Sequence, residues 1–143
     1  MPAYTTQDAL ILRFTEDELK AVAGRGDDSE IDAAVVAKAI TDASGTIDSY
    51  IGARYALPLA TVPDQIKSAA EDLARYQLYT VECPALVKER RDQVIAWLRD
   101  ISTGKATLGV STPEPADAAQ SGNEILFEAG DRRTSRAELR KLL

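Results

Sequence analysis

Histidine is absent from the 143-residue sequence, and cysteine occurs once, as Cys83. Histidine is the commonest general acid–base residue, and zinc sites in proteins depend on several histidine or cysteine ligands. Hydrolases built on a Ser–His or Cys–His pair are therefore excluded, and a structural zinc site is close to excluded. A single cysteine cannot form a disulfide within the chain, which favours a reducing, cytoplasmic location.

Long apolar runs are also missing from the sequence. No run approaches the ~20 residues that a transmembrane helix needs, so we expect no membrane partner. Residues 1–8 lack a basic stretch followed by an apolar one, so we expect no secretory signal. No glycine-rich phosphate loop and no internal repeat is visible, and we predict no cofactor and no metal site.

Positive charge is scarce overall but concentrated near the C-terminus. The net charge is −6, which argues against a protein that mainly binds DNA phosphates. Residues 131–143 hold five basic and two acidic side chains, a net of +3, so the other 130 residues carry −9. Such a basic segment suits an acidic partner or the acidic body of a neighbouring copy, although a solvated helix of mixed charge explains the pattern equally well.

The apolar residues that are present recur at helical spacing and predict a mainly α fold: a small helical bundle with one long central helix. The clearest apolar stripe, at intervals of three and four, lies in the long helix and comprises Val36, Ile40, Ala43, Ile47, Tyr50 and Ile51. Its alanines permit close approach of another helix. Helices are predicted near residues 6–12, 15–24, 30–54, 63–80 and 84–104.

Capping residues mark where several of these helices begin and end. Thr6 is expected to cap the first helix, and Thr15 with Glu18 is expected to form a capping box, in which each side chain bonds the other's backbone. Gly104 is expected to end the last helix. The charged face of that last helix, residues 88–92 with Arg99, is predicted to be solvated.

Composition changes after residue 109. We predict a helical domain over residues 1–110, followed by a linker and a C-terminal docking tail over residues 111–143, with room for a short strand and a helix. The apolar run Ile125-Leu126-Phe127 has too little chain around it to form a core. We therefore expect this tail to dock on the helical domain, on another subunit or on a partner.

One motif order is more specific than composition. It consists of Tyr4–Asp8 with Phe14-Thr15, then Ile47–Ile51, Arg54-Tyr55, Leu57–Leu59, Val62-Pro63, Ala70–Tyr76 and Leu98–Gly104. Over residues 3–109 this order resembles the head–tail joining (neck) protein family of Mu-like phages and prophages, which are small helical adaptors beneath the portal. The chain departs from the family at Arg91-Asp92-Gln93, where an aromatic–alanine pair is frequent, and its tail matches only loosely.

The resemblance implies a structural head–tail connector with no enzyme activity. It implies a homo-oligomeric ring, often of twelve copies, that meets the portal protein and a tail-completion protein, with DNA passing through the channel without specific binding. The location would be the virion neck, and the host cytoplasm during assembly. The residues of the family motif, expected to hold the fold, are Tyr50, Arg54, Tyr55, Pro58, Pro63 and Tyr76; those expected at the assembly interface are Ile125, Leu126, Phe127, Arg132, Arg133, Arg136 and Leu139.

The expected physical roles of these motif residues are simple. The tyrosines are large amphipathic groups that can close the core with their hydroxyls at its edge. Pro58 and Pro63 stiffen the connection between two helices. Arg54 is expected to pair with an acid such as Asp48 or Asp72.

Two other function classes remain open. A small helical nucleic-acid-binding regulator would need a basic recognition helix, and the C-terminal segment is the only basic one. A carboxylate enzyme, with or without magnesium, would draw on residues 16–18 or on Glu71 and Asp72. Adjacent acids on a helix point to different faces, however, so we expect these to be solvated surface groups.

Overall fold

The computed structural model describes residues 3–24 and 30–110. This part of the chain forms five α-helices and no strand: α1 (Gln7–Phe14), α2 (Glu16–Ala23), α3 (Ala33–Ile51), α4 (Asp64–Leu78) and α5 (Ala85–Thr103). The mainly α fold is thereby confirmed. The predicted linker, the Ile125-Leu126-Phe127 run and the C-terminal helix lie outside the described residues.

The helix ends follow local capping chemistry, with one exception described below. The Thr6 hydroxyl accepts a hydrogen bond from the Ala9 N–H at 3.3 Å, as predicted. Helix α3 begins later than expected, because Asp32 is its cap and accepts from the Ala34 N–H at 3.0 Å. Gly104 ends α5 in the left-handed conformation, with φ +84°, a conformation that glycine adopts without steric cost.

The predicted capping box at Thr15 is wrong. Within the described chain Thr15 makes no side-chain cap bond, and its φ is +80°. Its N–H instead closes α1 on the Ile11 carbonyl at 2.9 Å, so the backbone here is set by the sharp turn between α1 and α2. The Glu18 side chain is committed elsewhere, to Arg75 on α4.

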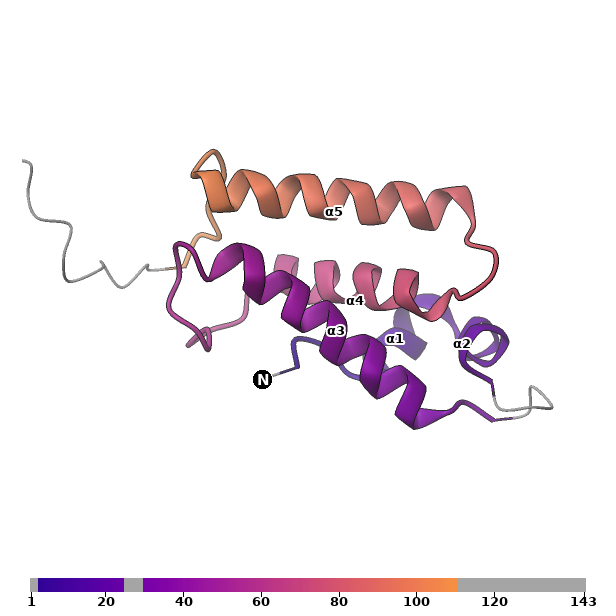
Figure 1. The fold of residues 1–143 in the computed structure, drawn as a ribbon. Helices are drawn as coiled ribbons and strands as arrows, with labels where there is room; N and C mark the ends of the chain where they lie inside the picture. The colour runs from indigo at the N-terminus through magenta and orange to yellow at the C-terminus, as the bar shows by residue number, and fades with distance from the viewer. Residues whose placement is uncertain (1–2, 25–29, 111–143) are drawn as a thin grey trace, which may run out of the picture. The chain divides into compact units, whose positions relative to one another are not determined.

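The core lies where the three long helices meet. Helices α3, α4 and α5 each pack against the other two, and α1 joins α3 and α4 (Figure 1). The predicted stripe of α3 is buried, apart from Tyr50, which is half-buried. Small side chains are part of this core: Ala43 of α3 and Ala70 and Ala74 of α4 are completely buried. Of the five alanines of α3, Ala39 and Ala43 are buried and Ala33, Ala34 and Ala37 are exposed, so only two of them can lie against a neighbouring helix.

Candidate functional site

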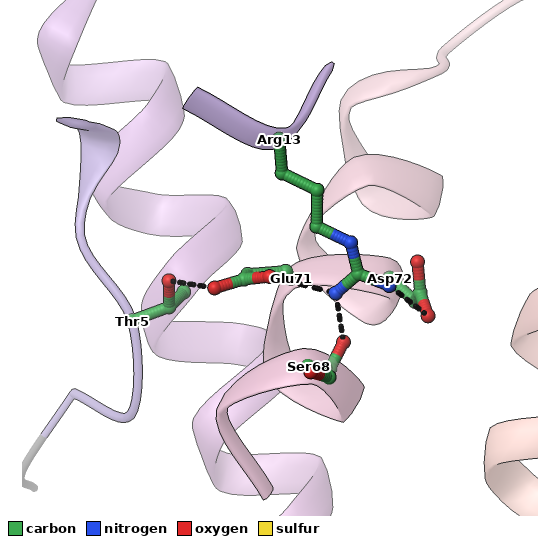
Figure 2. Close-up of polar contacts among 5 residues, drawn as sticks. All are labelled: Thr5, Arg13, Ser68, Glu71 and Asp72. Atoms are coloured by element: carbon green, nitrogen blue, oxygen red, sulfur yellow. Dashed lines mark hydrogen bonds and ion pairs between the residues drawn. The ribbon is translucent and has the colours of Figure 1, made fainter. Parts of the chain in front are cut away.

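One arginine of α1 donates hydrogen bonds to two carboxylates and one carbonyl of α4. Arg13 Nη1 donates to Glu71 Oε2 at 2.6 Å and to the Ser68 carbonyl at 2.9 Å, and its Nη2 donates to Asp72 Oδ2 at 3.1 Å. Thr5 donates its hydroxyl to the other oxygen of Glu71, at 3.4 Å (Figure 2). We call these five residues the Arg13 cluster. It ties the N-terminal segment to α4.

The Arg13 cluster overturns the prediction that Glu71 and Asp72 are solvated. Their side chains are 14% and 10% exposed, and that of Arg13 is 29% exposed. Adjacent acids do leave a helix in different directions, but the forked guanidinium group spans both of them. Sequence reasoning missed this contact because Arg13 lies 58 positions before Glu71. No local pattern connects Arg13 with α4.

A second arginine, Arg75, lies one turn after Glu71 on α4 and ties α4 to α2. Arg75 donates to Glu18 Oε1 on α2 at 2.6 Å, and the Tyr79 hydroxyl donates to the same oxygen at 2.9 Å. The Arg75 guanidinium also lies 4.4 Å from the centre of the Phe14 ring, and that of Arg13 lies 5.1 Å from it, within cation–π range. Glu18 is therefore another predicted surface acid that the structure places in an ion pair.

A groove runs between α4 and α5 beside the Arg13 cluster, with a volume of about 430 Å³. We call it the α4–α5 groove. Asp72 reaches this groove with a carboxylate whose Oδ1 is buried and has no hydrogen-bond partner among the described residues. The residues that line the groove are Asp64, Gln65, Ser68, Ala69 and Asp72 of α4 and Arg90, Gln93, Val94 and Trp97 of α5.

A buried tyrosine–aspartate pair fixes the start of the chain to α3. The Tyr4 hydroxyl donates to Asp48 Oδ1, and the Tyr4 N–H donates to Ser44 Oγ at 3.2 Å. All three side chains are buried. Burial first, and then the hydrogen bond and charge of Asp48, raise the pKa of the Tyr4 hydroxyl above its ordinary value of 10.0. Sequence reasoning missed this pair, because it assigned Asp48 to Arg54.

Tyr4 makes stability depend on pH in the alkaline range. Its pKa is raised by folding, so the unfolded chain releases the proton first as the pH passes 10.0, and the stabilisation that is complete below this pH is lost above it. Tyr79 acts in the same direction, since burial and Glu18 raise its pKa too. We expect the free energy of unfolding of the native chain to fall above pH 10.

The measurement is urea denaturation across pH 8 to 11 on the native chain and on Tyr4→Phe. The variant is expected to be less stable at pH 8, because Asp48 loses its donor, and to show a flatter decline above pH 10. The control is Tyr79→Phe. Because Tyr79 is half-buried, we expect it to contribute less than Tyr4 to the alkaline loss of stability. An unchanged alkaline slope in Tyr4→Phe would contradict the assignment.

The tyrosines of the family motif lie at the edge of the core. Tyr55 is buried, and its hydroxyl accepts a hydrogen bond from the Leu108 N–H at 3.0 Å, which ties the segment after α5 to the turn after α3. Tyr76 is half-buried beneath Arg91, whose guanidinium lies 4.4 Å from the ring centre and donates to the Tyr76 hydroxyl at 3.1 Å. Arg91 is thus not part of the solvated face predicted for α5.

Arg54 does not pair with Asp48 or Asp72, and that prediction is wrong. Its guanidinium donates to the Ile101 carbonyl at 3.5 Å and lies against Gly104, where a Cβ atom would come within 2.7 Å of Nη1. The two acids are held instead by Tyr4 and Arg13. Arg54 therefore closes the C-terminal end of α5, where exposed carbonyls favour a cation.

Both motif prolines lie on the connection from α3 to α4. Pro63 immediately precedes α4 and serves as its cap residue, and Pro58 lines a pocket of about 490 Å³ beside Tyr55. Gly109 and Val110, the last described residues, line the same pocket. All seven residues predicted for the assembly interface, from Ile125 to Leu139, lie outside the described part of the chain.

The model of the family described as "Bacteriophage Mu, Gp36" matches residues 4–126. The chain belongs to this Mu Gp36 family. It is 33% identical over 129 residues to the "Mu-like prophage FluMu protein gp36" of Haemophilus influenzae, covering 90% of each chain. It is 30% identical over 123 residues to "Gene product J" of Escherichia phage Mu, covering 82% of this chain and 87% of the relative.

The match confirms that the chain resembles proteins of Mu-like phages and prophages. It extends the similarity seen in the motif order, which covered residues 3–109, as far as residue 126. The Gp36-family match therefore includes Ile125 and Leu126, two of the predicted interface residues.

Two structural features of this Gp36-family chain bear on its chemistry. Among residues 3–24 and 30–110, no group of three or more cysteine, aspartate or glutamate side chains is placed to hold a metal ion. None of the described helices has the length and apolar character needed to cross a membrane.

Proposed function

We propose that this Gp36-family protein is a structural head–tail connector of a tailed Mu-like bacteriophage or prophage. In this role it forms a ring between the portal and a tail-completion protein, and DNA passes through the ring without specific binding. The observation that carries the proposal is the family match over residues 4–126, joined to the neck-protein resemblance of the motif order.

The chemistry of the described charged groups supports a structural role. The Arg13 cluster and the Arg75–Glu18–Tyr79 contacts join α1 and α2 to α4, and Arg54 closes the end of α5. These arginines hold helices together, and the acids that they bind are occupied by that task. Such contacts suit a subunit that keeps its shape while it binds neighbours.

Exposed apolar side chains give the helical domain places to meet a partner. Val81 and Leu86 flank the turn from α4 to α5 and are 98% and 57% exposed, and Leu12 on α1 is 90% exposed. Single exposed apolar residues are common on monomers, but a subunit that is covered in an assembly gains from burying them.

The test is light scattering behind size-exclusion chromatography over a wide concentration range, with the full chain alone and mixed with its cognate portal protein. Negative-stain imaging identifies the large fraction. We expect a closed ring of many copies, alone or on the portal. A chain that stays monomeric and does not bind the portal would overturn the proposal.

A binding measurement with duplex DNA at about 150 mM salt separates this role from the regulator, because an acidic connector should show no binding there. Submicromolar binding to DNA would favour the regulator instead. The same samples serve both measurements.

A further inference from the structure

Only one of the two oxygens of the Asp72 carboxylate has a hydrogen-bond donor among the described residues. Its Oδ2 accepts from Arg13 at 3.1 Å, while its Oδ1 is buried and has no partner within the described residues. Figure 2 shows the second oxygen free of the contacts that hold the first. Buried polar atoms are almost always hydrogen-bonded, and a charged one is the costliest to leave without a donor. The side chain as a whole is 10% exposed, so a small part of it reaches the surface, where Asp72 lines the α4–α5 groove.

The groove walls around Asp72 suit a cation with an apolar stem. Asp72, Ala69, Val94 and Trp97 all line the α4–α5 groove, and Trp97 is half-buried there. An arginine side chain can lay its methylenes on the apolar walls, bring its guanidinium to an indole ring and donate to a carboxylate oxygen. The groove therefore offers a guanidinium group an apolar wall, an aromatic ring and a carboxylate, and among the described residues Arg90 of α5 is the one positive charge already in its lining.

The charge of the chain indicates where that arginine comes from. Residues 131–143 carry +3 and include Arg132, Arg133 and Arg136, while the other 130 residues carry −9. Copies with acidic bodies repel one another when they assemble. A basic segment that docks on its own body lowers the charge of that body but forms no contact between copies, whereas one that docks on a neighbour lowers the same charge and also joins the two copies by attraction. Twenty residues separate Val110 from Asp131, which at full extension span up to ~70 Å, enough to reach a neighbouring copy.

We propose that the basic segment 131–143 of a second copy docks in the α4–α5 groove, where one of its arginines binds the Asp72 carboxylate beside Trp97. This inference rests on the proposed function, because it requires copies that assemble. It goes further by naming the surface and the segment that join them.

Trp97 is the only tryptophan in the sequence, so its emission reports on the groove. In full-length protein, we expect the emission maximum to move to shorter wavelength as concentration rises and light scattering records assembly. Replacing Arg132, Arg133 and Arg136 together with glutamine should abolish the shift. It should also vanish at about 1 M salt, where the screening length falls to ~3 Å.

A second variant blocks the groove without touching the Arg13 cluster. Gln93 is exposed on the groove wall, and Gln93→Arg places a cation beside the site from within the same chain. We expect it to prevent the concentration-dependent shift while helix content and melting stay unchanged. The matched control is Gln77→Arg, which makes the same change in a different pocket and should leave the shift intact. Equal behaviour of the two variants would overturn the proposal.

Cross-linking distinguishes a neighbour's segment from the chain's own. In a Cys83→Ser background, one sample carries Ser68→Cys in the groove and another carries Arg133→Cys. Mixing and oxidising the two should give at least ~10-fold more heterodimer than pairing Arg133→Cys with Ser49→Cys, an exposed position on α3, because docking raises the local thiol concentration.

The outcomes separate the two proposals. Rings on the portal without this heterodimer, and without any effect of the arginine substitutions, would overturn the groove proposal and leave the connector role intact. If the native chain emitted at shorter wavelength than the triple arginine variant at every concentration, the segment would dock on its own chain. That result would overturn docking in a neighbour. Failure to assemble and to bind the portal would remove both proposals together.

Discussion

Replacing Arg13 with leucine is expected to lower the free energy of unfolding by about 2 kcal/mol. The substitution leaves the carboxylates of Glu71 and Asp72, 14% and 10% exposed, side by side without their shared cation. It also removes the donor to the Ser68 carbonyl. The loss stays below that for a fully buried pair because the Arg13 side chain, 29% exposed, still reaches water. Urea denaturation followed by circular dichroism at pH 7 gives the value.

The control for this prediction is an ion pair of ordinary surface type. Lys38 binds Asp42 at 2.7 Å on α3, with both side chains well exposed, so Lys38→Leu should change stability little. Adding Asp72→Asn to Arg13→Leu should recover part of the loss, because it removes one of the unpaired charges. If Arg13→Leu were no more harmful than Lys38→Leu, the Arg13 cluster would not hold α1 to α4.

Replacing Ala43 with leucine is expected to cost about 3 kcal/mol, the upper end of the range for overpacked cores. Ala43 is completely buried on α3, and Ala70 and Ala74 are completely buried on α4, the helix with which α3 packs most extensively. A larger side chain must push the two helices apart or adopt a strained rotamer. Thermal and urea denaturation should both show the loss.

Ala37→Leu is the matched control on the same helix. Ala37 is exposed, so the same substitution there should change stability by no more than about 0.5 kcal/mol. Equal effects at the two positions would mean that α3 and α4 are not in close contact at Ala43.

Elements set by local sequence were predictable. The spacing of apolar residues identified α3 and its buried stripe, although α5 is equally long at 19 residues; Thr6 capped α1 as expected, and Gly104 ended α5. The predicted start of α3, near residue 30, was three residues too early, because Asp32 is the residue that caps the helix. The Thr15 capping box failed because the turn between α1 and α2 fixed its backbone at φ +80°.

The contacts of the candidate site were not predictable from spacing. Arg13 and Asp72 are 59 positions apart, and Tyr4 and Asp48 are 44 apart. Which acid an arginine reaches depends on how two helices dock, and periodicity within one helix carries no information on that. For the same reason the ion pair predicted for Arg54 was wrong: Tyr4 binds Asp48 and Arg13 binds Asp72.

The sequence by itself therefore determined a helical protein without histidine chemistry, its apolar stripes and most of its helix ends, because these depend on residues within one or two turns of each other. Only the tertiary structure decided that Glu18, Glu71 and Asp72 are ion-paired and that one oxygen of Asp72 has no donor among residues 3–24 and 30–110. It alone formed the α4–α5 groove, because a groove exists only where side chains of two helices, distant in the chain, are packed into one surface.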